Sequence, residues 1–425
     1  MMKVLIVNTS ERTGGAAVAA NRLKDALNNN GIEANMLVRD KLSDDTTVFT
    51  IKNGWRTQWN KLWERWCIFW HLHFSKRNLF AIDIANAGTD ITQLQAFKDA
   101  DVVHLAWINQ GMLSLKGIEK ILKTGKPLVW TMHDIWPATA VCHITLDCRQ
   151  FETQCKDCRL LPSGIGRNLA RRTWKRKEAI EGRSHIIYIT CSKWLQGEAK
   201  QSALIGQNTI ECIPNPIDTN VFRKVDKAEA RRKLGLPADK RLVLFASQRV
   251  TNHNKGMNYL VDACRKMAEQ HPEMLENTAV VVLGGHAEDL REQFNLPMFP
   301  LGYVSDTQKI VDVYNAIDVF VTPSLSDNLP NTVMEAMACG VPCVGFKVGG
   351  IPEMIDHERN GYVVKMKDST DLATGIHWVL NVADYEMLSA EAVEKVKQCY
   401  SQAQVAAQYI AVYEKALANS KTKEV

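Results

Sequence analysis

The sequence lacks the long apolar runs and the leader pattern that would place the chain in or across a membrane. No stretch approaches the roughly eighteen consecutive apolar residues that a membrane-spanning helix needs. The segment from Met1 to Asn8 is a short apolar strand that runs straight into Thr9, Ser10 and Glu11, without the layout of a signal peptide. We therefore expect a cytoplasmic protein that is either soluble or peripheral on the inner face of a membrane.

The sequence is also poor in features of nucleic acid binding, disulfide frameworks and repeats. Its net charge of +5 is mild, and it has neither an RNA-binding aromatic motif nor an arginine-rich tail. The 11 cysteines, spread over 425 residues, are typical of reduced thiols. There is no solenoid repeat and no low-complexity tract. These absences argue against nucleic acid as a partner and leave an anionic ligand or a membrane surface.

The length and composition are those of two ordinary folded domains. At 425 residues, with 46% hydrophobic and 23% charged residues, the chain exceeds a single core. In the first half, apolar strands that are suited to burial on both faces alternate with helical stretches, which predicts a parallel, doubly wound sheet. The expected strands are 3–8, 34–38, 102–107, 128–132 and 186–190, and the expected helices are 16–29, 90–99, 115–123 and 163–182.

A second alternation of the same kind follows a stiff Pro-Asn-Pro turn within residues 210–218 and a charged linker over 223–241. We expect its strands at 242–247, 279–284, 317–321 and 341–346 and its helices at 256–270, 287–294 and 305–316. The predicted fold class is therefore α/β, with two doubly wound, Rossmann-like domains facing each other across a cleft. The expected domains are 1–220, with a cysteine-rich insert over 142–158, and 221–395, followed by a C-terminal helix and tail over 396–425.

Residues 319–353 constrain the chemistry more tightly than any other stretch. An apolar run ends at Thr322, a loop carries Asp327, and Asn331 opens a short helix that holds Glu335. A helix start presents unpaired N–H groups and the positive end of a dipole, so this loop suits a phosphate. Glu335, one turn into the helix, is placed to accept both hydroxyls of a ribose. We interpret the stretch as a nucleotide site; the alternative is an ordinary βαβ unit with a surface glutamate.

Two other loops follow expected strands and open helices. Gly14 and Gly15 come after the first strand, and paired glycines let a backbone approach a ligand closely, although tight turns also favour them. Arg249 and Lys255 lie between strand 242–247 and the next helix. Two cations there would neutralise a diphosphate leaving group without a metal ion. The alternative for this pair is a solvated basic loop.

A histidine and an aspartate follow strand 128–132 directly. His133 is interpreted as a polar donor to a sugar hydroxyl, and the alternative is a hydrogen-bonded core histidine next to a helix-capping Asp134. His104, within an expected strand, is interpreted as structural.

Taken together, these elements resemble the glycosyltransferases of family four (glycosyl transferases group 1), which are retaining enzymes with the two-domain GT-B fold. The resemblance spans nearly the whole chain and is strongest over 245–365. That family carries an E-x7-E motif; here the spacing is kept from Asp327 to Glu335, but the first position is aspartate. The resemblance implies that Asp327 contacts the donor sugar and that Glu335 contacts the ribose of the nucleotide.

The same resemblance assigns further positions. Arg249 and Lys255 match the pair that holds the donor diphosphate, although the loop between them looks one residue longer than usual, and His133 matches the family's cleft histidine. No metal or other cofactor is implied for catalysis, in keeping with the lack of a D-x-D motif at a suitable strand end. The remaining donor-binding positions are the glycine loop at Gly14 and Gly15, Tyr303 and Val304 beside the nucleobase, and the backbone of Asn328, Leu329, Asn331 and Thr332 along the phosphates and sugar.

The implied function is transfer of a sugar of the hexose type from a nucleotide sugar to a glycan or lipid-linked acceptor, with retention, in surface polysaccharide biosynthesis. Residues 1–220 would hold the acceptor and 221–395 the donor. One alternative is a sugar-nucleotide epimerase or hydrolase of the same fold. Another is a non-catalytic nucleotide-sugar sensor, which the aspartate at 327 favours.

Four cysteines directly after the His133 loop have the spacing C-x5-C-x6-C-x2-C. Four thiols within seventeen residues, ending in C-x2-C, suit a structural zinc ion that would stabilise an insertion with little core of its own. Disulfides and uncoordinated thiols are the alternatives. The expected ligands are Cys142, Cys148, Cys155 and Cys158.

Aromatic residues recur at three- and four-residue spacing between 55 and 77, interleaved with cations. This combination suits the headgroup layer of a membrane, where a lipid-linked acceptor would wait, and a basic helix over 167–177 could join the same face. The alternative is a helix packed on the first domain with solvated charges. The first set is Trp55, Trp59, Leu62, Trp63, Trp66, Phe69, Trp70 and His73 with Arg56, Lys61, Arg65, Lys76 and Arg77; the second is Arg167, Arg171, Arg172, Lys175, Arg176 and Lys177.

Overall fold

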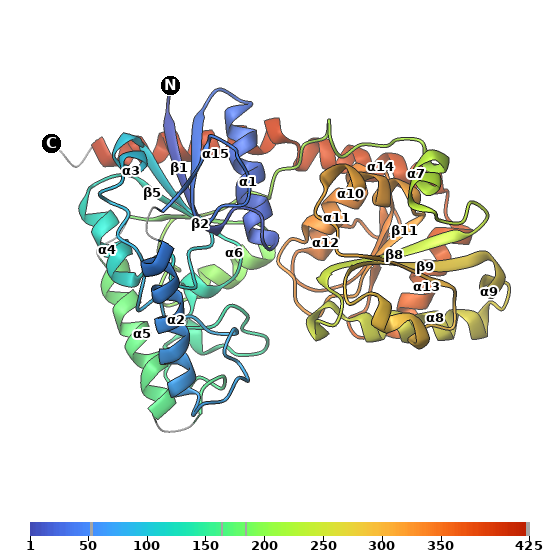
Figure 1. Cartoon of the computed structure of the whole chain (residues 1–425), viewed down its shortest axis with the longest axis horizontal. Coiled ribbons are helices and arrows are strands. Elements are labelled where there is room, and N and C mark those ends of the chain that lie inside the picture. The colour runs from blue at the N-terminus through green and yellow to red at the C-terminus, as the bar shows by residue number, and fades with distance from the viewer. Residues whose placement is uncertain (52–53, 163–164, 183–184, 422–425) are drawn as a thin grey trace. The chain divides into compact units, whose positions relative to one another are not determined.

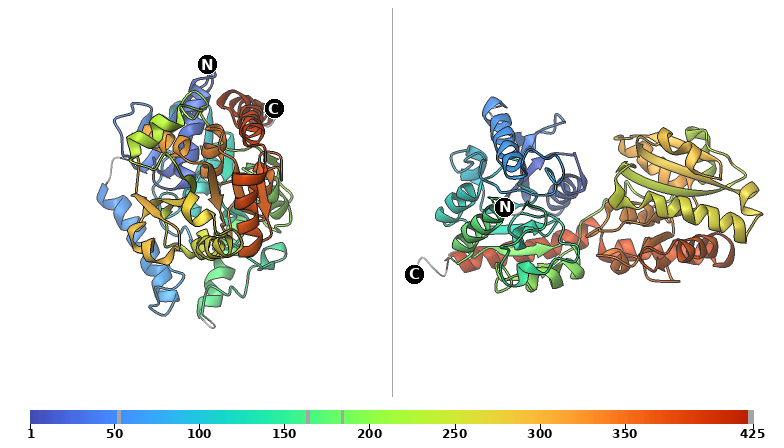
Figure 2. Two further views of the ribbon diagram at one scale, coloured as in Figure 1. Left: turned by 90° about the vertical axis from the view of Figure 1, so that its right-hand side faces the viewer. Right: turned by 90° about the horizontal axis from the view of Figure 1, so that it is seen from below.

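The computed structural model describes residues 1–51, 54–162, 165–182 and 185–421, with backbone alone for 165–167 and 421 (Figure 1). The chain forms two compact units, one of Met1–Pro216 with the segment from Val405 onward, and one of Ile217–Gln404. Each unit is a parallel sheet with helices on both faces (Figures 1 and 2). Within the described ranges, no helix is long and apolar enough to cross a membrane.

Unit 1 is built on a seven-stranded sheet of order β3-β2-β1-β4-β5-β6-β7, in which all neighbours run parallel. The strand order reverses between β1 and β4, which is where ligands bind in open sheets of this kind. The strands are β1 (Lys3–Ser10), β2 (Glu33–Asp40), β3 (Val48–Thr50), β4 (Val102–Leu105), β5 (Leu128–Met132), β6 (Ile187–Thr190) and β7 (Ile210–Cys212).

The two faces of this sheet are buried in separate layers because successive side chains of a strand point to opposite sides. Leu5 and Val7 of β1 face one apolar cluster, and Val4 and Ile6 face the other. The first layer holds α2 (Gly54–His71), α3 (Gln95–Asp99), α4 (Leu115–Lys123), α5 (Ile165–Glu181) and α6 (Lys193–Lys200), and the second holds α1 (Gly15–Asn28) and α15 (Gln402–Lys421).

Unit 2 is built on a six-stranded parallel sheet of order β10-β9-β8-β11-β12-β13, with its reversal between β8 and β11. The strands are β8 (Arg241–Arg249), β9 (Thr278–Gly285), β10 (Met298–Gly302), β11 (Val319–Thr322), β12 (Cys343–Phe346) and β13 (Gly361–Val364). The helices are α7 (Lys227–Leu234), α8 (Met257–Gln270), α9 (Met274–Asn277), α10 (Thr307–Ala316), α11 (Asn331–Ala338), α12 (Ile351–Met354), α13 (Ser369–His377) and α14 (Tyr385–Cys399), with short turns η3 (His253–Lys255) and η4 (Glu288–Gln293).

The expected fold class of two doubly wound α/β sheets is confirmed, with differences at the edges. Strands β3, β7, β10 and β13 were not expected as strands. These short strands include polar residues, proline or glycine rather than a continuous apolar run. The helix expected over 90–99 begins only at Gln95, and the helix expected over 287–294 is the 3-10 turn η4.

The C-terminal helix α15 returns to unit 1 and is held there by a buried polar network. His104 of β4 contacts the Tyr413 hydroxyl through Nδ1 at 2.6 Å and the Thr131 hydroxyl through Nε2 at 2.8 Å. The Thr131 hydroxyl also lies 3.0 Å from that of Tyr409. Burial, with a contribution from nearby His133, lowers the pKa of His104 to about 3. His104 therefore stays neutral at physiological pH and has a structural role.

Replacing His104 by glutamine tests this network through the pH dependence of stability. Because the folded pKa of about 3 lies below the ordinary 6.5, the unfolded chain takes up a proton that the folded chain does not as the pH falls. The contribution of His104 to the free energy of unfolding is thus fully present above about pH 6.5. Below that pH it declines by up to about 1.4 kcal/mol per pH unit. We expect His104→Gln to be less stable at neutral pH but to show a shallower decline in chemical denaturation. Equal slopes in both proteins would contradict this account.

Candidate functional site

Three loops of unit 2 meet at the edge of the sheet where its strands end. Strand β11 pairs in parallel with β8 on one side and with β12 on the other, so the residues that follow these strands emerge together. Arg249 is the last residue of β8, and Lys255 ends the turn η3 that follows it. The loop after β11 carries Asp327, and the loop after β12 carries Gly349. The expected site residues of this unit therefore come from neighbouring loops.

Close backbone contacts fix these loops to one another. The amide of Leu325 donates to the carbonyl of Asn254 at 2.8 Å. Gly256 has φ +73, and a Cβ there would lie 1.8 Å from the carbonyl oxygen of Pro323. Gly349 has φ +56, and its Cβ would lie 1.7 Å from the carbonyl oxygen of Asp327. Only glycine fits either position, since both the conformation and the space exclude a side chain.

The strongest charge contact of the site joins two of the loops. Lys255 Nζ donates to Asp327 Oδ2 at 2.6 Å, and the side chains are 34% and 15% exposed. Arg249 is exposed, and within the described part of the chain its guanidinium has neither an ion pair nor a hydrogen bond. Two backbone bonds, Asn252 N to Arg249 O at 3.0 Å and Lys255 N to Asn252 O at 2.9 Å, tie the two cations into one turn. One cation is thus held by a carboxylate of the same site, and the other is open to an anion.

Helix α11 supplies the second carboxylate and a helix start. Glu335 is 8% exposed, and its Oε2 accepts a hydrogen bond of 2.9 Å from the hydroxyl of the buried Tyr314. No side chain caps the helix at Pro330, and Asn331 and Thr332 in its first turn are half-buried. A helix start of this kind attracts negative charge. Sequence patterns gave no sign of Tyr314, which lies on α10 and holds the glutamate in place.

The remaining expected donor positions differ in their exposure. Tyr303, directly after β10, is 61% exposed, and Val304 beside it is half-buried. Asn328 is half-buried and Leu329 is buried in the loop after β11. A cavity of about 220 Å³, which the sequence did not indicate, lies beside η3 and is lined by His253, Tyr259, Leu290 and Gln293 among others.

Unit 1 presents its own expected residues at the ends of β1 and β5. Gly14 has φ +93 and precedes α1 without any side-chain cap, and a Cβ there would meet nothing within 4 Å. Glycine is therefore favoured at position 14 by the backbone conformation and not by a lack of space. Gly15 next to it is exposed. His133 is half-buried, with Nδ1 3.7 Å from the Cys191 sulfur. Burial lowers the pKa of His133 to about 4, so this ring is neutral at physiological pH.

Next to His133 lies a charged network that the sequence did not reveal. His143 reaches Asp83 Oδ2 through Nε2 at 2.6 Å and Asp134 Oδ2 through Nδ1 at 2.8 Å. Asp134 also accepts from the Trp107 indole at 2.9 Å, and Asp83 also pairs with Arg65. Burial raises the pKa of Asp134, but the charge of His143 and these hydrogen bonds outweigh it and keep that pKa below its usual range. No sequence motif predicts this network, because its residues are far apart in the sequence.

The four cysteines expected to bind zinc are free thiols in the structure, as are the other seven. Burial, with a contribution from neighbouring thiols, raises the pKa of Cys142 to about 12 and that of Cys155 to about 11. Among the described residues, only His271, Glu273 and His377 place three metal-ligating atoms within 4.8 Å of one another. Cys142, Cys148, Cys155 and Cys158 do not reach that spacing, and zinc binding by them remains a proposal.

The aromatic segment forms α2, which ends at His71, and much of its aromatic face is exposed. Trp55 is 72% exposed, and Trp59, Leu62, Trp63, Trp66 and Trp70 are also exposed, whereas Phe69 is half-buried. For two cations the expected position on the surface is wrong. Arg65 is buried against Asp83, and Lys177 is buried with Nζ donating to the carbonyls of Trp136 at 2.6 Å and Thr139 at 2.9 Å. Burial lowers the pKa of Lys177 to about 7.

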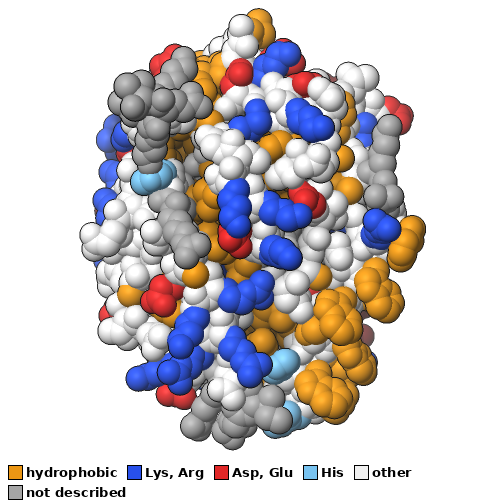
Figure 3. All heavy atoms as spheres, turned by 90° about the vertical axis from the view of Figure 1, so that its left-hand side faces the viewer, with side chains coloured by type: hydrophobic (Ala, Val, Ile, Leu, Met, Phe, Trp, Pro, Cys, Tyr) orange, Lys and Arg blue, Asp and Glu red, His pale blue; other side chains and the backbone are white. Residues whose placement is uncertain are grey.

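The rest of the basic helix is as exposed as expected. Arg171, Arg172, Lys175 and Arg176 of α5 all lie on the surface, while the side chain of Arg167 falls outside the described part. Helices α2 and α5 contact each other. Figure 3 shows lysine and arginine side chains gathered on one face, with large hydrophobic side chains beside them.

The fold and these loops define a class of protein, and comparison with known families agrees. One family model, described as Glycosyltransferase Family 4, matches residues 13–221, and a second, described as Glycosyl transferases group 1, matches residues 240–382. Together they cover most of the chain. The chain belongs to the glycosyltransferases of group 1 and family 4, and its fold is of the GT-B type.

Individual relatives match this chain at low sequence identity or over only part of their length. An uncharacterized glycosyltransferase of Methanocaldococcus jannaschii is 32% identical over 243 residues, which is 54% of this chain and 60% of the relative's length. Sucrose-phosphate synthase of Thermosynechococcus elongatus has a similar structure, with a TM-score of 0.65 and 18% identity over 99% of this chain and all of the other. HepE of Anabaena, in complex with UDP-glucose, has a TM-score of 0.63 and 17% identity over 98% of this chain and all of the other. The structural likenesses show the fold alone.

Replacing Gly256 by alanine tests the contact that sets the Lys255 loop against the loop after β11. The added Cβ would collide with Pro323, so we expect a loss of about 3 kcal/mol in the free energy of unfolding. Gly235 is the matched control, because it has φ +66 but open space around its Cβ. Gly235→Ala should cost only about 1 kcal/mol. Similar losses in the two variants, measured by chemical denaturation, would contradict the close contact.

Proposed function

We propose that this protein transfers a sugar, of the hexose type, from a nucleotide sugar to a glycan or lipid-linked acceptor, with retention at the anomeric carbon. The observation that carries the proposal is the meeting of Arg249, Lys255, Asp327 and the start of α11 at one edge of the unit 2 sheet. Two cations beside a helix start suit a diphosphate, which is the leaving group of such a donor. Building of a surface polysaccharide is the process in which we place this reaction.

Each side chain of the site has a task in this proposal. Arg249 and Lys255 hold the donor diphosphate and stabilise the charge that develops on it as the bond to the sugar breaks. Glu335, held by Tyr314, accepts the ribose hydroxyls, and Asp327 contacts the donor sugar. No metal ion is needed where two side-chain cations neutralise the phosphates. Tyr303 and Val304 flank the nucleobase, and Asn328, Leu329, Asn331 and Thr332 line the phosphates and sugar.

In this proposal unit 1 holds the acceptor, and Gly14 and Gly15 are donor-binding positions. Their open backbone lets a ligand approach the start of α1 closely. The neutral ring of His133 can donate to or accept from a sugar hydroxyl without bringing a charge to it. Because a similar fold has been solved with UDP-glucose, uridine diphosphate sugars are the first donors to test.

Activity measurements on two variants of unit 2 test the assignment. Lys255→Met should lower kcat/KM about 100- to 1000-fold, because a cation on the leaving group is lost. Glu335→Gln should weaken donor binding about tenfold or more, because the ribose loses a charged acceptor. Lys266→Met is the control, since this lysine lies far along α8, where its ammonium donates to the Thr370 hydroxyl. Retention is checked by the anomeric configuration of the product.

Three results would count against the proposal. Full activity of Lys255→Met would remove the role of that cation. Release of free or isomerised sugar without an acceptor would indicate a hydrolase or epimerase. Binding of nucleotide sugars without turnover under any condition would indicate a sensor.

The same proposal includes a membrane contact, with the protein on the cytoplasmic side. The only carboxylate of α2, Glu64, is buried and accepts from the amides of Ile84 and Ala85 at 3.0 and 2.6 Å. The exposed face of α2 is therefore aromatic and bears no negative charge, and the exposed cations of α5 belong to a neighbouring helix. Aromatic side chains beside cations suit the interface of a membrane with anionic lipids.

Sedimentation with lipid vesicles tests this contact. The protein should pellet with vesicles that contain anionic lipid at low salt, and less so at high salt. The triple change Trp59→Gln, Trp66→Gln and Trp70→Gln should weaken binding about tenfold or more, because three aromatic side chains no longer enter the interface. Trp194→Gln, a partly exposed tryptophan on α6, is the control. A wild-type protein that stays in the supernatant would contradict the membrane contact.

A further inference from the structure

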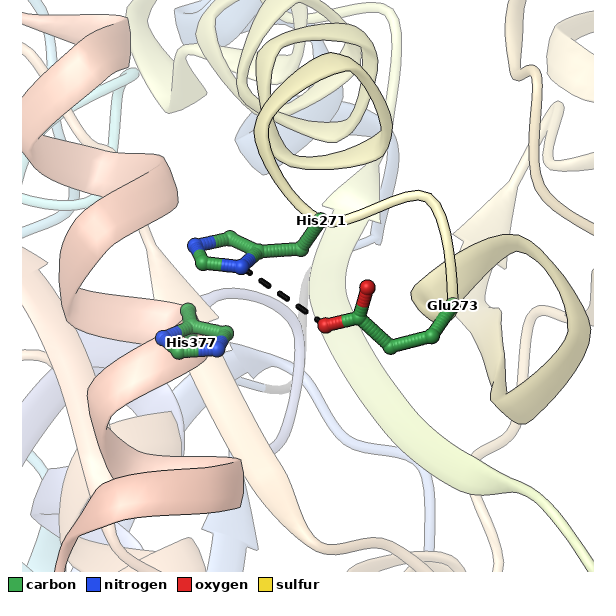
Figure 4. Close-up of side chains that lie close together, drawn as sticks. All are labelled: His271, Glu273 and His377. Carbon is green, nitrogen blue, oxygen red and sulfur yellow. Dashed lines mark ion pairs between the residues drawn. The ribbon is translucent and has the colours of Figure 1, made fainter.

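Three side chains at or next to three helices of unit 2 converge at a place that the proposed function does not use. His271 directly follows α8, Glu273 directly precedes α9, and His377 is the last residue of α13 (Figure 4). One ligating atom from each lies within 4.8 Å of the other two, and His271 Nδ1 is 3.6 Å from Glu273 Oε1. Both histidines are half-buried and Glu273 is exposed, so the cluster is open to solvent on one side.

The cluster lies at the opposite edge of the sheet from the donor loops. Helix α8 begins at Met257, next to Lys255, and runs back along the sheet for fourteen residues to His271, a length of about 20 Å. The two places are therefore separated by the whole of α8. A ligand of this cluster has no direct contact with the donor.

The charge around the cluster favours a cation. Helix α8 ends there, and the last carbonyl groups of a helix carry partial negative charge. Glu273 adds a full negative charge. The two imidazole rings stack with centroids 3.7 Å apart and planes within 5°, so their nitrogen atoms lie close together.

We propose that His271, Glu273 and His377 bind a divalent transition metal ion of the zinc type, with water in the fourth position. Two imidazoles and one carboxylate are ligands that zinc favours. An imidazole binds a metal in the plane of its own ring, so one of the stacked rings turns about its Cβ–Cγ bond to share the ion. That torsion is soft, and both rings are only half-buried.

Such an ion would join the end of α8 and His377 of α13 to the start of α9. The same segments also pack through buried side chains of the unit 2 core, among them Met267, Met274 and Ile376. Metal binding would then stabilise unit 2 without a step in sugar transfer. If this cluster binds no metal, the proposed function is unaffected. If the proposed function is wrong, the metal site is equally unaffected.

Equilibrium dialysis of the metal-free, full-length protein against Zn²⁺ tests the proposal. Wild-type protein should bind one equivalent more than the double variant His271→Gln, His377→Gln, whatever the cysteines of unit 1 bind, because those are the same in both. Glu273→Gln should weaken this equivalent about tenfold or more, and Zn²⁺ should raise the melting temperature of the wild type above that of the double variant.

His286→Gln is the matched control. Its imidazole is exposed and lies 3.2 Å from a carboxylate, Asp289, but among the described residues no third ligand completes a cluster with this pair. This variant should bind as much Zn²⁺ as the wild type. The absorption spectrum of bound Co²⁺ gives a second readout. It distinguishes this site from a cysteine site, since imidazole and carboxylate ligands lack the charge-transfer absorption of thiolates. Equal stoichiometry in wild type and double variant, or an equal loss in His286→Gln, would overturn the proposal.

Discussion

The ion pair between Lys255 and Asp327 is the contact on which the rest of the site depends. It joins the loop after β8 to the loop after β11, and it is partly buried at 2.6 Å. In the absence of a donor, the carboxylate neutralises the cation that the diphosphate would need. We infer that a donor phosphate takes over Lys255 and that Asp327 then turns to the sugar. An aspartate side chain is one methylene shorter than that of glutamate and reaches less far. Pairing with Lys255 fixes the position of the Asp327 carboxylate before a donor binds.

The backbone makes this contact possible. Parallel neighbours in the sheet bring the two loops to the same edge, and the reversal of strand order between β8 and β11 opens a space there. Gly256 and Gly349 then let the loops approach within van der Waals distance, where any side chain would collide. Glu335 is held independently by Tyr314, so the residues proposed for the ribose and for the phosphates rest on different parts of the structure.

The sequence predicted the buried parts of the fold well because central parallel strands are continuous apolar runs. It did not predict β3, β7, β10 and β13, whose short segments include polar residues, proline or glycine. The loops of the site could be predicted from strand ends and helix starts, and from the resemblance to a known family. Spacing alone gave a wrong surface position to Arg65 and Lys177, because their partners, Asp83 and the carbonyls of Trp136 and Thr139, are distant in the sequence.

Networks built from distant segments were beyond the sequence for the same reason. His143 bridges Asp83 and Asp134, and His271 stacks on His377, and neither pairing has a local pattern. The aromatic face of α2 was visible from its helical spacing, since a single helix carries it. What the spacing could not show is that its one carboxylate points inward, which leaves the outer face free of negative charge.

The affinity of a nucleoside diphosphate for two variants tests the central ion pair most directly. If Asp327 competes with phosphate for Lys255, Asp327→Asn should bind uridine diphosphate at least as tightly as the wild type in calorimetric titration while losing sugar transfer. Lys255→Met should weaken binding about tenfold or more. Weaker binding in Asp327→Asn together with unchanged binding in Lys255→Met would contradict the account.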